Sequence, residues 1–137
     1  MPGTGSDHTQ AAVERRADIR LWLDDVRLPP DDSWTWAKTI DEAIPILKSG
    51  LVVEASLDND LGEDADGEKL AEGRKLVLWM AEHQIWPSDR LRVHSSNTVA
   101  VGYMNGTIER YGPYGRPTRQ GGGLVFSADA DRALSGQ

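Results

Sequence analysis

Three short stretches of the sequence place acidic or polar side chains directly after an apolar run. These polar groups are Asp24-Asp25, Asp58-Asn59-Asp60 and His94-Ser95-Ser96-Asn97. Carboxylates are ligands that Mg²⁺ prefers, and hydroxyl or amide groups at a helix start suit an anion such as phosphate. Brought together, the three groups would suit a divalent cation and a phosphate far better than a structural core, where polar side chains are costly to bury.

The three groups meet only if the apolar runs before them are neighbouring parallel strands. In an α/β sheet the carboxyl ends of parallel strands open into one crevice, and ligands bind there. The runs cover residues 19–23, 52–57 and 91–93. The first run has apolar residues at successive positions, which is typical of a strand buried on both faces. Residues 33–37 alternate and predict a further short strand, and residues 124–127 predict an edge strand.

Helical patterns separate these strands. Thr39 is the expected N-cap of a helix, because Glu42 follows Thr39 at the capping-box spacing. Gly50 is expected to end this helix. Apolar residues recur at helical spacing between residues 68 and 84, and a last helix is expected over residues 98–110. This alternation of strands and helices predicts an α/β fold.

The connection between the first two expected strands is unusual. Residues 25–33 contain Pro29-Pro30 and leave no room for a helix, yet a parallel crossover normally takes a dozen or more residues. The second strand is therefore either antiparallel to the first or reached by an irregular loop, and the sequence does not decide between these two.

Length and composition limit the class of protein. The chain of 137 residues fits one domain, which we expect over residues 18–128, between a flexible arm at 1–17 and a frayed tail at 129–137. A net charge of −7 argues against binding along bulk duplex nucleic acid, and the lack of cysteine excludes disulfides and thiolate sites. The sequence has no apolar run near the roughly 20 residues of a membrane span and no signal-peptide pattern at its start. We expect a cytoplasmic protein without membrane contact.

Four aspartates are the candidate metal ligands, namely Asp24, Asp25, Asp58 and Asp60. The first two end one strand, and the period of a strand points the last two to the same side. The expected cation is Mg²⁺ or Mn²⁺. Asp60 is expected either to bind the cation directly or to contact one of its ligands. A solvated acidic turn is the simpler interpretation of either pair alone, but two acid-terminated strands together favour a metal site.

His94 is the candidate general acid or base, because the unperturbed imidazole pKa of about 6.5 lies close to neutral pH. The candidate phosphate-binding residues are Arg27, Ser95, Ser96 and Asn97. Each of these has a plainer alternative. His94 would then be a buried structural residue, Ser96 or Asn97 a helix N-cap, and Arg27 the partner of a nearby carboxylate.

The ordered set of motifs resembles the cyclic-phosphate processing receiver domain family, whose members are small relatives of the phosphoacceptor receiver domains of two-component signalling. The resemblance covers about residues 19–111. The motifs that carry it are Leu23-Asp24-Asp25-Val26-Arg27 with Pro29-Pro30, Ser56-Leu57-Asp58-Asn59-Asp60-Leu61-Gly62, Gly73 through Trp79-Met80, and Val93-His94-Ser95-Ser96-Asn97. It implies a receiver-like (flavodoxin-like), mostly parallel sheet flanked by helices, and a role in binding or hydrolysing cyclic phosphates.

The sequence also departs from an ordinary receiver. The positions that match are the acidic pair Asp24 and Asp25, the phosphoacceptor position Asp58, and the fourth-strand hydroxyl at Ser95 or Ser96. The helix between the first two strands is shortened or missing, and the stretch around residues 124–128 has no lysine to match the one that ends the fifth strand. Asn59 stands where family members often have histidine. These departures favour a repurposed phosphate site over aspartyl-phosphate signalling.

The sequence therefore predicts a metal-dependent protein that binds or hydrolyses cyclic phosphates, which as an enzyme would be a phosphodiesterase. Its partner would be a phosphate-containing small molecule or an RNA end with a 2′,3′-cyclic phosphate. Two alternatives stay open at this point. One is a non-catalytic receiver-like module that senses a phosphorylated ligand or docks a partner protein, and the other is a phosphoacceptor receiver that uses Asp58.

Overall fold

The computed structural model describes residues 18–63 and 65–128, so the predicted arm and tail lie outside the described part of the chain. Its strands are β1 (Ile19–Leu23), β2 (Trp34–Ala37), β3 (Val52–Leu57), β4 (Arg90–Val93), β5 (Thr118–Gln120) and β6 (Gly123–Ser127). Its helices are α2 (Ile40–Lys48), α3 (Gly73–His83) and α4 (Thr98–Tyr111). Among the described residues, no helix has the length and apolar character needed to cross a membrane.

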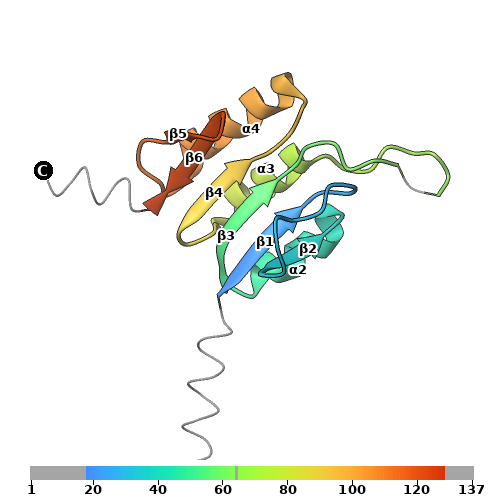
Figure 1. Cartoon of the computed structure of the whole chain (residues 1–137), viewed down its shortest axis with the longest axis horizontal. Coiled ribbons are helices and arrows are strands. Elements are labelled where there is room, and N and C mark those ends of the chain that lie inside the picture. The colour runs from blue at the N-terminus through green and yellow to red at the C-terminus, as the bar shows by residue number, and fades with distance from the viewer. Residues whose placement is uncertain (1–17, 64, 129–137) are drawn as a thin grey trace, which may run out of the picture.

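The six strands form one sheet in the order β2-β1-β3-β4-β6-β5 (Figure 1). β2, β1, β3 and β4 are parallel to one another, whereas β6 pairs antiparallel with both β4 and β5. This confirms the predicted receiver-like α/β fold with a mostly parallel sheet. It also confirms that the three apolar runs before the polar groups are neighbouring parallel strands, in the order β1, β3, β4.

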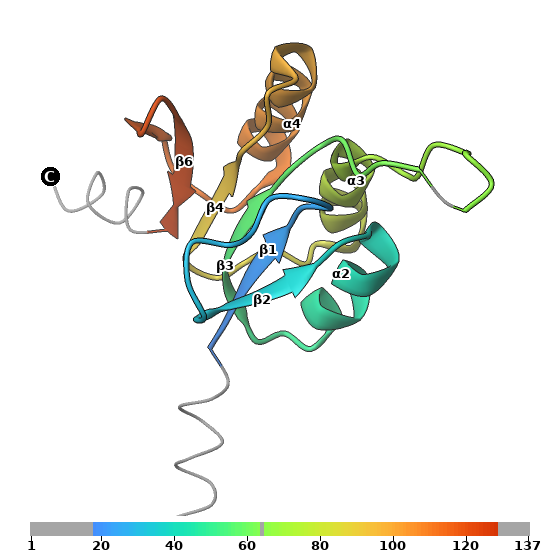
Figure 2. The same cartoon turned by 45° about the vertical axis from the view of Figure 1, so that its right-hand side comes forward.

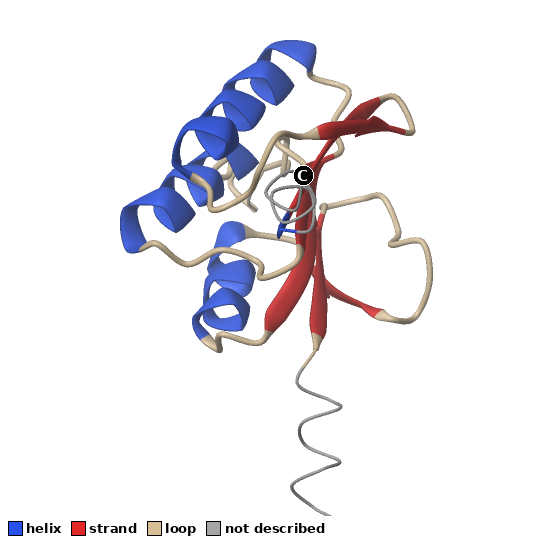
Figure 3. Ribbon diagram, turned by 90° about the vertical axis from the view of Figure 1, so that its left-hand side faces the viewer, coloured by secondary structure: helices blue, strands red, loops and turns tan. Residues whose placement is uncertain are grey.

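The helices α2, α3 and α4 of the described residues lie on one face of the sheet (Figure 3). Alternate strand residues point into the layer between sheet and helices, so that Leu23, Leu57 and Phe126 are fully buried there. Helix α2 begins as predicted, because Thr39 Oγ1 accepts a hydrogen bond from the Glu42 main-chain N–H (3.1 Å). This single core fixes the strand ends that carry the polar groups.

The connection from β1 to β2 takes the irregular route, since β2 is parallel to β1 and residues 24–33 contain no helix. The loop runs on the face of the sheet opposite the helices (Figures 2 and 3). Two indole N–H groups hold it there: Trp22 Nε1 donates to the Arg27 carbonyl (2.8 Å) and Trp36 Nε1 to the Asp24 carbonyl (2.7 Å). These tryptophans hold the turn at Asp24-Asp25 in place. In an ordinary receiver, a helix makes this connection between the first two strands.

Helix α3 begins at Gly73, five residues later than the helical spacing predicted. The segment before it folds back on the loop after β3 instead of continuing the helix. Glu63 and Lys69 form an antiparallel bridge, and the Leu70 N–H donates to the Gly62 carbonyl (2.9 Å). The main-chain groups that a longer helix would need are therefore already paired.

The predicted edge strand near the C-terminus is β6, and it lies inside the sheet. Residues 118–120, for which the sequence predicted no strand, form the edge strand β5 and pair with β6. The Gly121-Gly122 turn joins the two strands, with both glycines at positive φ (60° and 83°). A three-residue strand with three exposed residues gives little apolar signal, so its pairing could not be read from the sequence.

Gly73 allows α3 to start directly against the end of β3. A Cβ at this position would lie 1.9 Å from the Asp58 carbonyl oxygen, which is main chain and cannot rotate away. We expect Gly73→Ala to lower the free energy of unfolding by about 3 kcal/mol, the upper end of the usual cost of overpacking. Denaturant unfolding measures the loss. The control is Gly106→Ala in α4, where nothing lies within 4 Å, and it should be neutral or stabilising. Equal stability of Gly73→Ala and the wild type would contradict this close contact.

Candidate functional site

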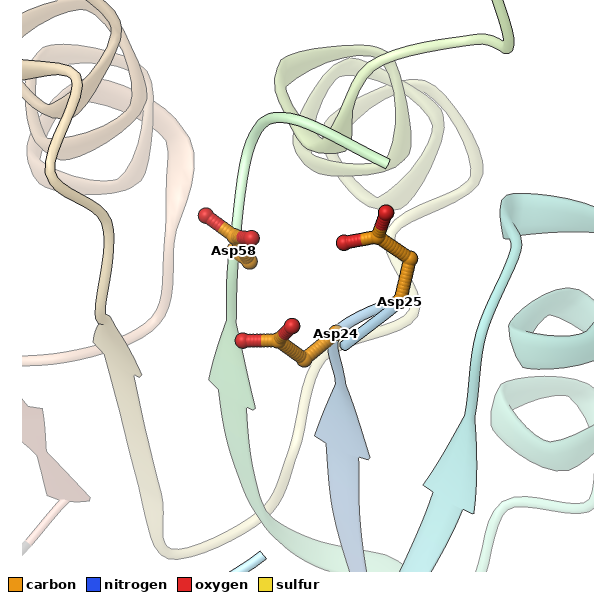
Figure 4. Close-up of side chains that lie close together, drawn as sticks. All are labelled: Asp24, Asp25 and Asp58. Carbon is orange, nitrogen blue, oxygen red and sulfur yellow. The ribbon is translucent and has the colours of Figure 1, made fainter. Parts of the chain in front are cut away.

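Three carboxylates converge at the carboxyl ends of β1 and β3 (Figure 4). Asp24 and Asp25 follow β1, and Asp58 follows β3. One ligand oxygen from each lies within 4.8 Å of the others. Asp24 is buried, while Asp25 and Asp58 are half-buried and point toward the same space. Such a group of oxygen donors is the kind that holds Mg²⁺ or Mn²⁺ in proteins.

Asp24 is held in place by hydrogen bonds on both of its oxygens. Oδ1 accepts the main-chain N–H groups of Val26 (3.0 Å) and Arg27 (2.8 Å), and Oδ2 lies 2.9 Å from His94 Nε2. Burial acts to raise the pKa of Asp24, but these hydrogen bonds outweigh it and hold the pKa below its usual range. Asp24 is therefore an ionised, fixed carboxylate that caps the turn after β1 and lies beside the other two carboxylates.

Asp58 has the opposite electrostatics. Burial raises the pKa of Asp58, the negative charge of Asp24 raises it further, and hydrogen bonds from Ser95 and from the Asn59 N–H offset only part of this. The folded protein thus holds two carboxylates together at a cost that a bound cation would relieve. The donor set and its charge fit a hard divalent cation.

Gly62, in the loop after β3, lies close to the Asp25 carboxylate of this cluster. Its φ is +80°, and a Cβ there would lie 2.7 Å from Asp25 Oδ2. The loop after β3 therefore comes close to the Asp25 carboxylate only because residue 62 has no side chain. Gly62 ends one of the motifs that carry the family resemblance, but the sequence predicted no role for it.

His94 is engaged on both ring nitrogens. Nδ1 lies 2.7 Å from Ser56 Oγ, and Nε2 lies 2.9 Å from Asp24 Oδ2. Burial lowers the pKa of His94 despite the nearby Asp24 charge, so the ring is neutral at neutral pH. Because an ionised carboxylate only accepts hydrogen bonds, Nε2 carries the proton and Nδ1 accepts from the Ser56 hydroxyl. The Trp22 ring stacks on the imidazole, with centroids 3.9 Å apart and planes 10° from parallel.

The other predicted site residues divide into two groups. Ser95 lies at the cluster, where its hydroxyl bonds to Asp58, and Asn97 caps α4 by accepting the Ala100 N–H at Oδ1 (3.1 Å). Ser96 and the side chain of Arg27 are exposed at the rim. Asp60 is exposed and is not one of the three clustered carboxylates, because its Oδ1 accepts a hydrogen bond from Asn59 Nδ2 (3.0 Å) in the loop beyond the strand.

Sequence reasoning missed Ser56 and Trp22 as parts of the site. The two are register partners on β3 and β1, and each stands two residues before a cluster aspartate. Strand periodicity therefore puts them on the same face as Asp24 and Asp58, the face that His94 covers. This signal was present in the sequence, but it becomes informative only once the strand order is known.

Comparison with known proteins agrees with this geometry. The model of the cyclic-phosphate processing receiver domain family matches residues 19–110, which is most of the described chain. This chain belongs to that family. Searches among curated proteins and among solved structures give no match.

Within the receiver framework, the last strand of this domain stands apart. β6 runs antiparallel to β4, so its carboxyl end at Ser127 lies beside the amino end of β4. The acidic cluster lies at the other end of the strands. No residue that ends β6 can reach Asp58, which explains in structural terms why the sequence shows no lysine there. Among the described residues, the candidate site of this cyclic-phosphate processing receiver domain is built on the carboxyl ends of β1, β3 and β4.

Proposed function

We propose that Asp24, Asp25 and Asp58 bind Mg²⁺ or Mn²⁺ and that the adjoining turn binds the phosphate of a cyclic phosphate, carried by a nucleotide or by an RNA end. The observation that carries this proposal is the approach of three carboxylates to within 4.8 Å beside the Ser95 hydroxyl. The family description names the processing of cyclic phosphates and so suggests the ligand class.

In this proposal, the residues around the cluster bind different oxygens of the phosphate. A divalent cation at the carboxylates would supply positive charge to a phosphoryl oxygen and to the attacking water. Ser96 offers a hydroxyl donor, and Ser95 would offer a second by releasing Asp58. Asn97 caps the start of α4, whose N–H groups suit an anion. Arg27 stands exposed at the rim, and its charge reaches His94, where it acts against the imidazolium form. In our proposal its guanidinium takes a phosphate oxygen that enters from solvent.

Hydrolysis of a cyclic phosphate needs one proton transfer to the leaving oxygen. The water oxygen bonds to phosphorus, the bond from phosphorus to one ribose oxygen breaks, and that ribose oxygen takes a proton. In our proposal His94 takes the proton that the water loses and passes it to the ribose oxygen, so that the imidazole is neutral again at the end of the cycle. Because Nε2–H donates to Asp24 in the resting protein, His94 must first leave that contact and adopt the tautomer in which Nδ1–H donates to Ser56, which frees Nε2 to accept the proton.

A non-catalytic module is the second candidate, and the engagement of both His94 nitrogens favours it. In that case the histidine orients Asp24, and the domain binds a phosphorylated ligand or a partner protein without cleaving it. The phosphoacceptor alternative has less support, since the antiparallel β6 leaves no strand-end lysine beside Asp58.

A metal-dependent activity screen separates these candidates. We expect hydrolysis of a 2′,3′-cyclic nucleotide, a 3′,5′-cyclic nucleotide or a cyclic-phosphate RNA end in the presence of Mg²⁺ or Mn²⁺, and loss of that activity with a chelator. The same protein incubated with acetyl phosphate should gain no phosphoryl group at Asp58 by mass spectrometry. Binding without turnover would support the sensing module, and a phosphorylated Asp58 that is absent in Asp58→Asn would support the receiver alternative.

A further inference from the structure

We infer that a groove between α3 and α4 binds the base of a nucleotide whose phosphate lies at the acidic cluster, an inference that rests on the proposed function. The groove has a volume of about 280 Å³. The lining residues that matter here are Asn59, Lys69, Arg74, Asn97, Val99 and Tyr103. A ligand in this groove would be a cyclic phosphate that carries a base, as opposed to a base-free sugar phosphate.

The groove begins where the proposed phosphate site ends. Asn59 directly follows the cluster residue Asp58, and Asn97 closes the turn that starts at Ser95. Asn59 is 1 % exposed, and its side-chain NH₂ donates to Asp60 (3.0 Å) and Glu72 (3.1 Å). This wall of the groove is therefore fixed, and a ligand held by phosphate at the turn has the groove as its adjacent space.

The α4 side of the groove offers an apolar surface suited to a flat ring. Val99 and Tyr103 lie one helical turn apart, with 68 % and 63 % of their surface exposed. Gly102 and Gly106 stand next to Tyr103 along the helix and add no side chain, and nothing lies within 4 Å of where a Cβ would be. Bases of every type stack on exposed aromatic rings, because each has a π-face.

The α3 side of the groove carries charge that suits a phosphorylated ligand. Lys69 Nζ lies 3.2 Å from a Glu72 oxygen, and Arg74 Nε lies 3.3 Å from the other. Among the residues that line the groove, two cations thus share one carboxylate, in a chain whose net charge is −7. The side chains of Lys69 and Arg74 are 66 % and 48 % exposed, so both can reach polar atoms of a base or its ribose.

Another exposed tyrosine on the same helix provides a matched control. Tyr111 at the end of α4 is 57 % exposed, close to the value of Tyr103, but it lies away from the groove, near Leu78 and Ala81 of α3. Replacing either tyrosine removes an exposed ring from α4, and neither change removes a buried side chain. The two variants differ in whether the lost ring faces the groove.

The test is a titration with two probes that undergo no turnover, adenosine 3′-monophosphate and ribose 5-phosphate, in the presence of Mg²⁺. We expect the wild type to bind the nucleotide more tightly than the base-free phosphate. Tyr103→Ala should weaken nucleotide binding by about tenfold, within the range typical of one base–aromatic stack, and leave ribose 5-phosphate binding unchanged. Tyr103→Phe should keep the nucleotide affinity because the ring remains, and Tyr111→Ala should leave the affinity for both probes unchanged.

The outcomes separate this inference from the proposed function. If the wild type binds both probes equally, or if Tyr103→Ala weakens neither or both alike, the base site is wrong and the phosphate site stands. If neither probe binds to the wild type, the phosphate site itself is wrong, and the base site falls with it. Equal weakening by Tyr111→Ala would also overturn the inference, because the groove would then have no special part in binding.

Discussion

Mg²⁺ or Mn²⁺ is expected to raise the melting temperature of the protein, and the double variant Asp25→Asn/Asp58→Asn is expected to lose that response. A ligand that binds only the folded state stabilises it by mass action, by about 2.7 kcal/mol at a concentration 100 times the dissociation constant. For a domain of this size that gain corresponds to roughly 10 °C in melting temperature. Thermal unfolding at several metal concentrations measures it.

The choice of variant follows from the different surroundings of the three carboxylates. Asp24 accepts two main-chain N–H groups and faces the His94 Nε2–H, so an amide in its place would set two donors against each other and destabilise the fold for reasons unrelated to metal. Burial raises the pKa of Asp58, which means that its ionised form is unfavourable in the folded protein. The double variant should therefore melt at or above the temperature of the metal-free wild type.

Asp60→Asn is the matched control for this experiment. It also removes one carboxylate from the loop after β3, but Asp60 is exposed and outside the cluster, so the metal response should persist. A double variant that keeps the full metal response would show that the cation binds elsewhere. Loss of the response in Asp60→Asn would show that the loop rearranges to bring a fourth carboxylate to the metal.

The convergence of the acidic strand ends was predictable because it depends on local patterns. Each apolar run identifies a strand, and the parallel-sheet rule brings the carboxyl ends together once the runs are neighbours. The placement of Asp60 was not predictable in this way. Strand period would point it to the side of Asp58, but the strand ends at Leu57, and the chain then turns so that the Asn59 carbonyl accepts the Gly73 N–H (2.8 Å). That contact joins residues far apart in sequence and has no local signal.

The directions of β2 and β6 could not be predicted from the sequence, for related reasons. The loop from β1 to β2 is fixed by indole N–H groups of Trp22 and Trp36, and nothing in the spacing of two tryptophans reveals which carbonyls they bond. The direction of β6 depends on its hairpin with β5, a strand whose three residues are all exposed. The missing lysine was visible in the sequence, but its cause appeared only with this antiparallel pairing.

The partners of His94 are the third feature that required the structure. The sequence left this residue as either an acid/base or a structural histidine, and both interpretations now have a concrete form. Its side chain is 12 % exposed, Ser56 and Asp24 hold its two nitrogens, and Trp22 covers one face. A group held this firmly is suited to orienting Asp24, and its Nε2 lies against the carboxylate cluster, where the proposed mechanism requires a proton transfer.

His94→Ala is expected to lower turnover by something like 10²–10⁴-fold, the usual contribution of a general acid or base. It should also lower the free energy of unfolding by about 1–3 kcal/mol, because the change leaves the buried Ser56 hydroxyl without the ring nitrogen it donates to. These two losses must be separated, so activity is expressed per folded molecule and stability is measured by denaturant unfolding on the same preparation.

His94→Gln and Ser56→Ala complete the experiment. An amide at position 94 can restore hydrogen bonds to Asp24 and Ser56 but cannot transfer a proton at neutral pH. If His94 is the acid or base, His94→Gln should recover stability without recovering turnover. Ser56→Ala removes a hydrogen bond to Nδ1 and keeps the imidazole, so most of the turnover should remain. If His94→Gln restores both stability and turnover, the histidine serves only to hold Asp24 in place, and the catalytic role is wrong.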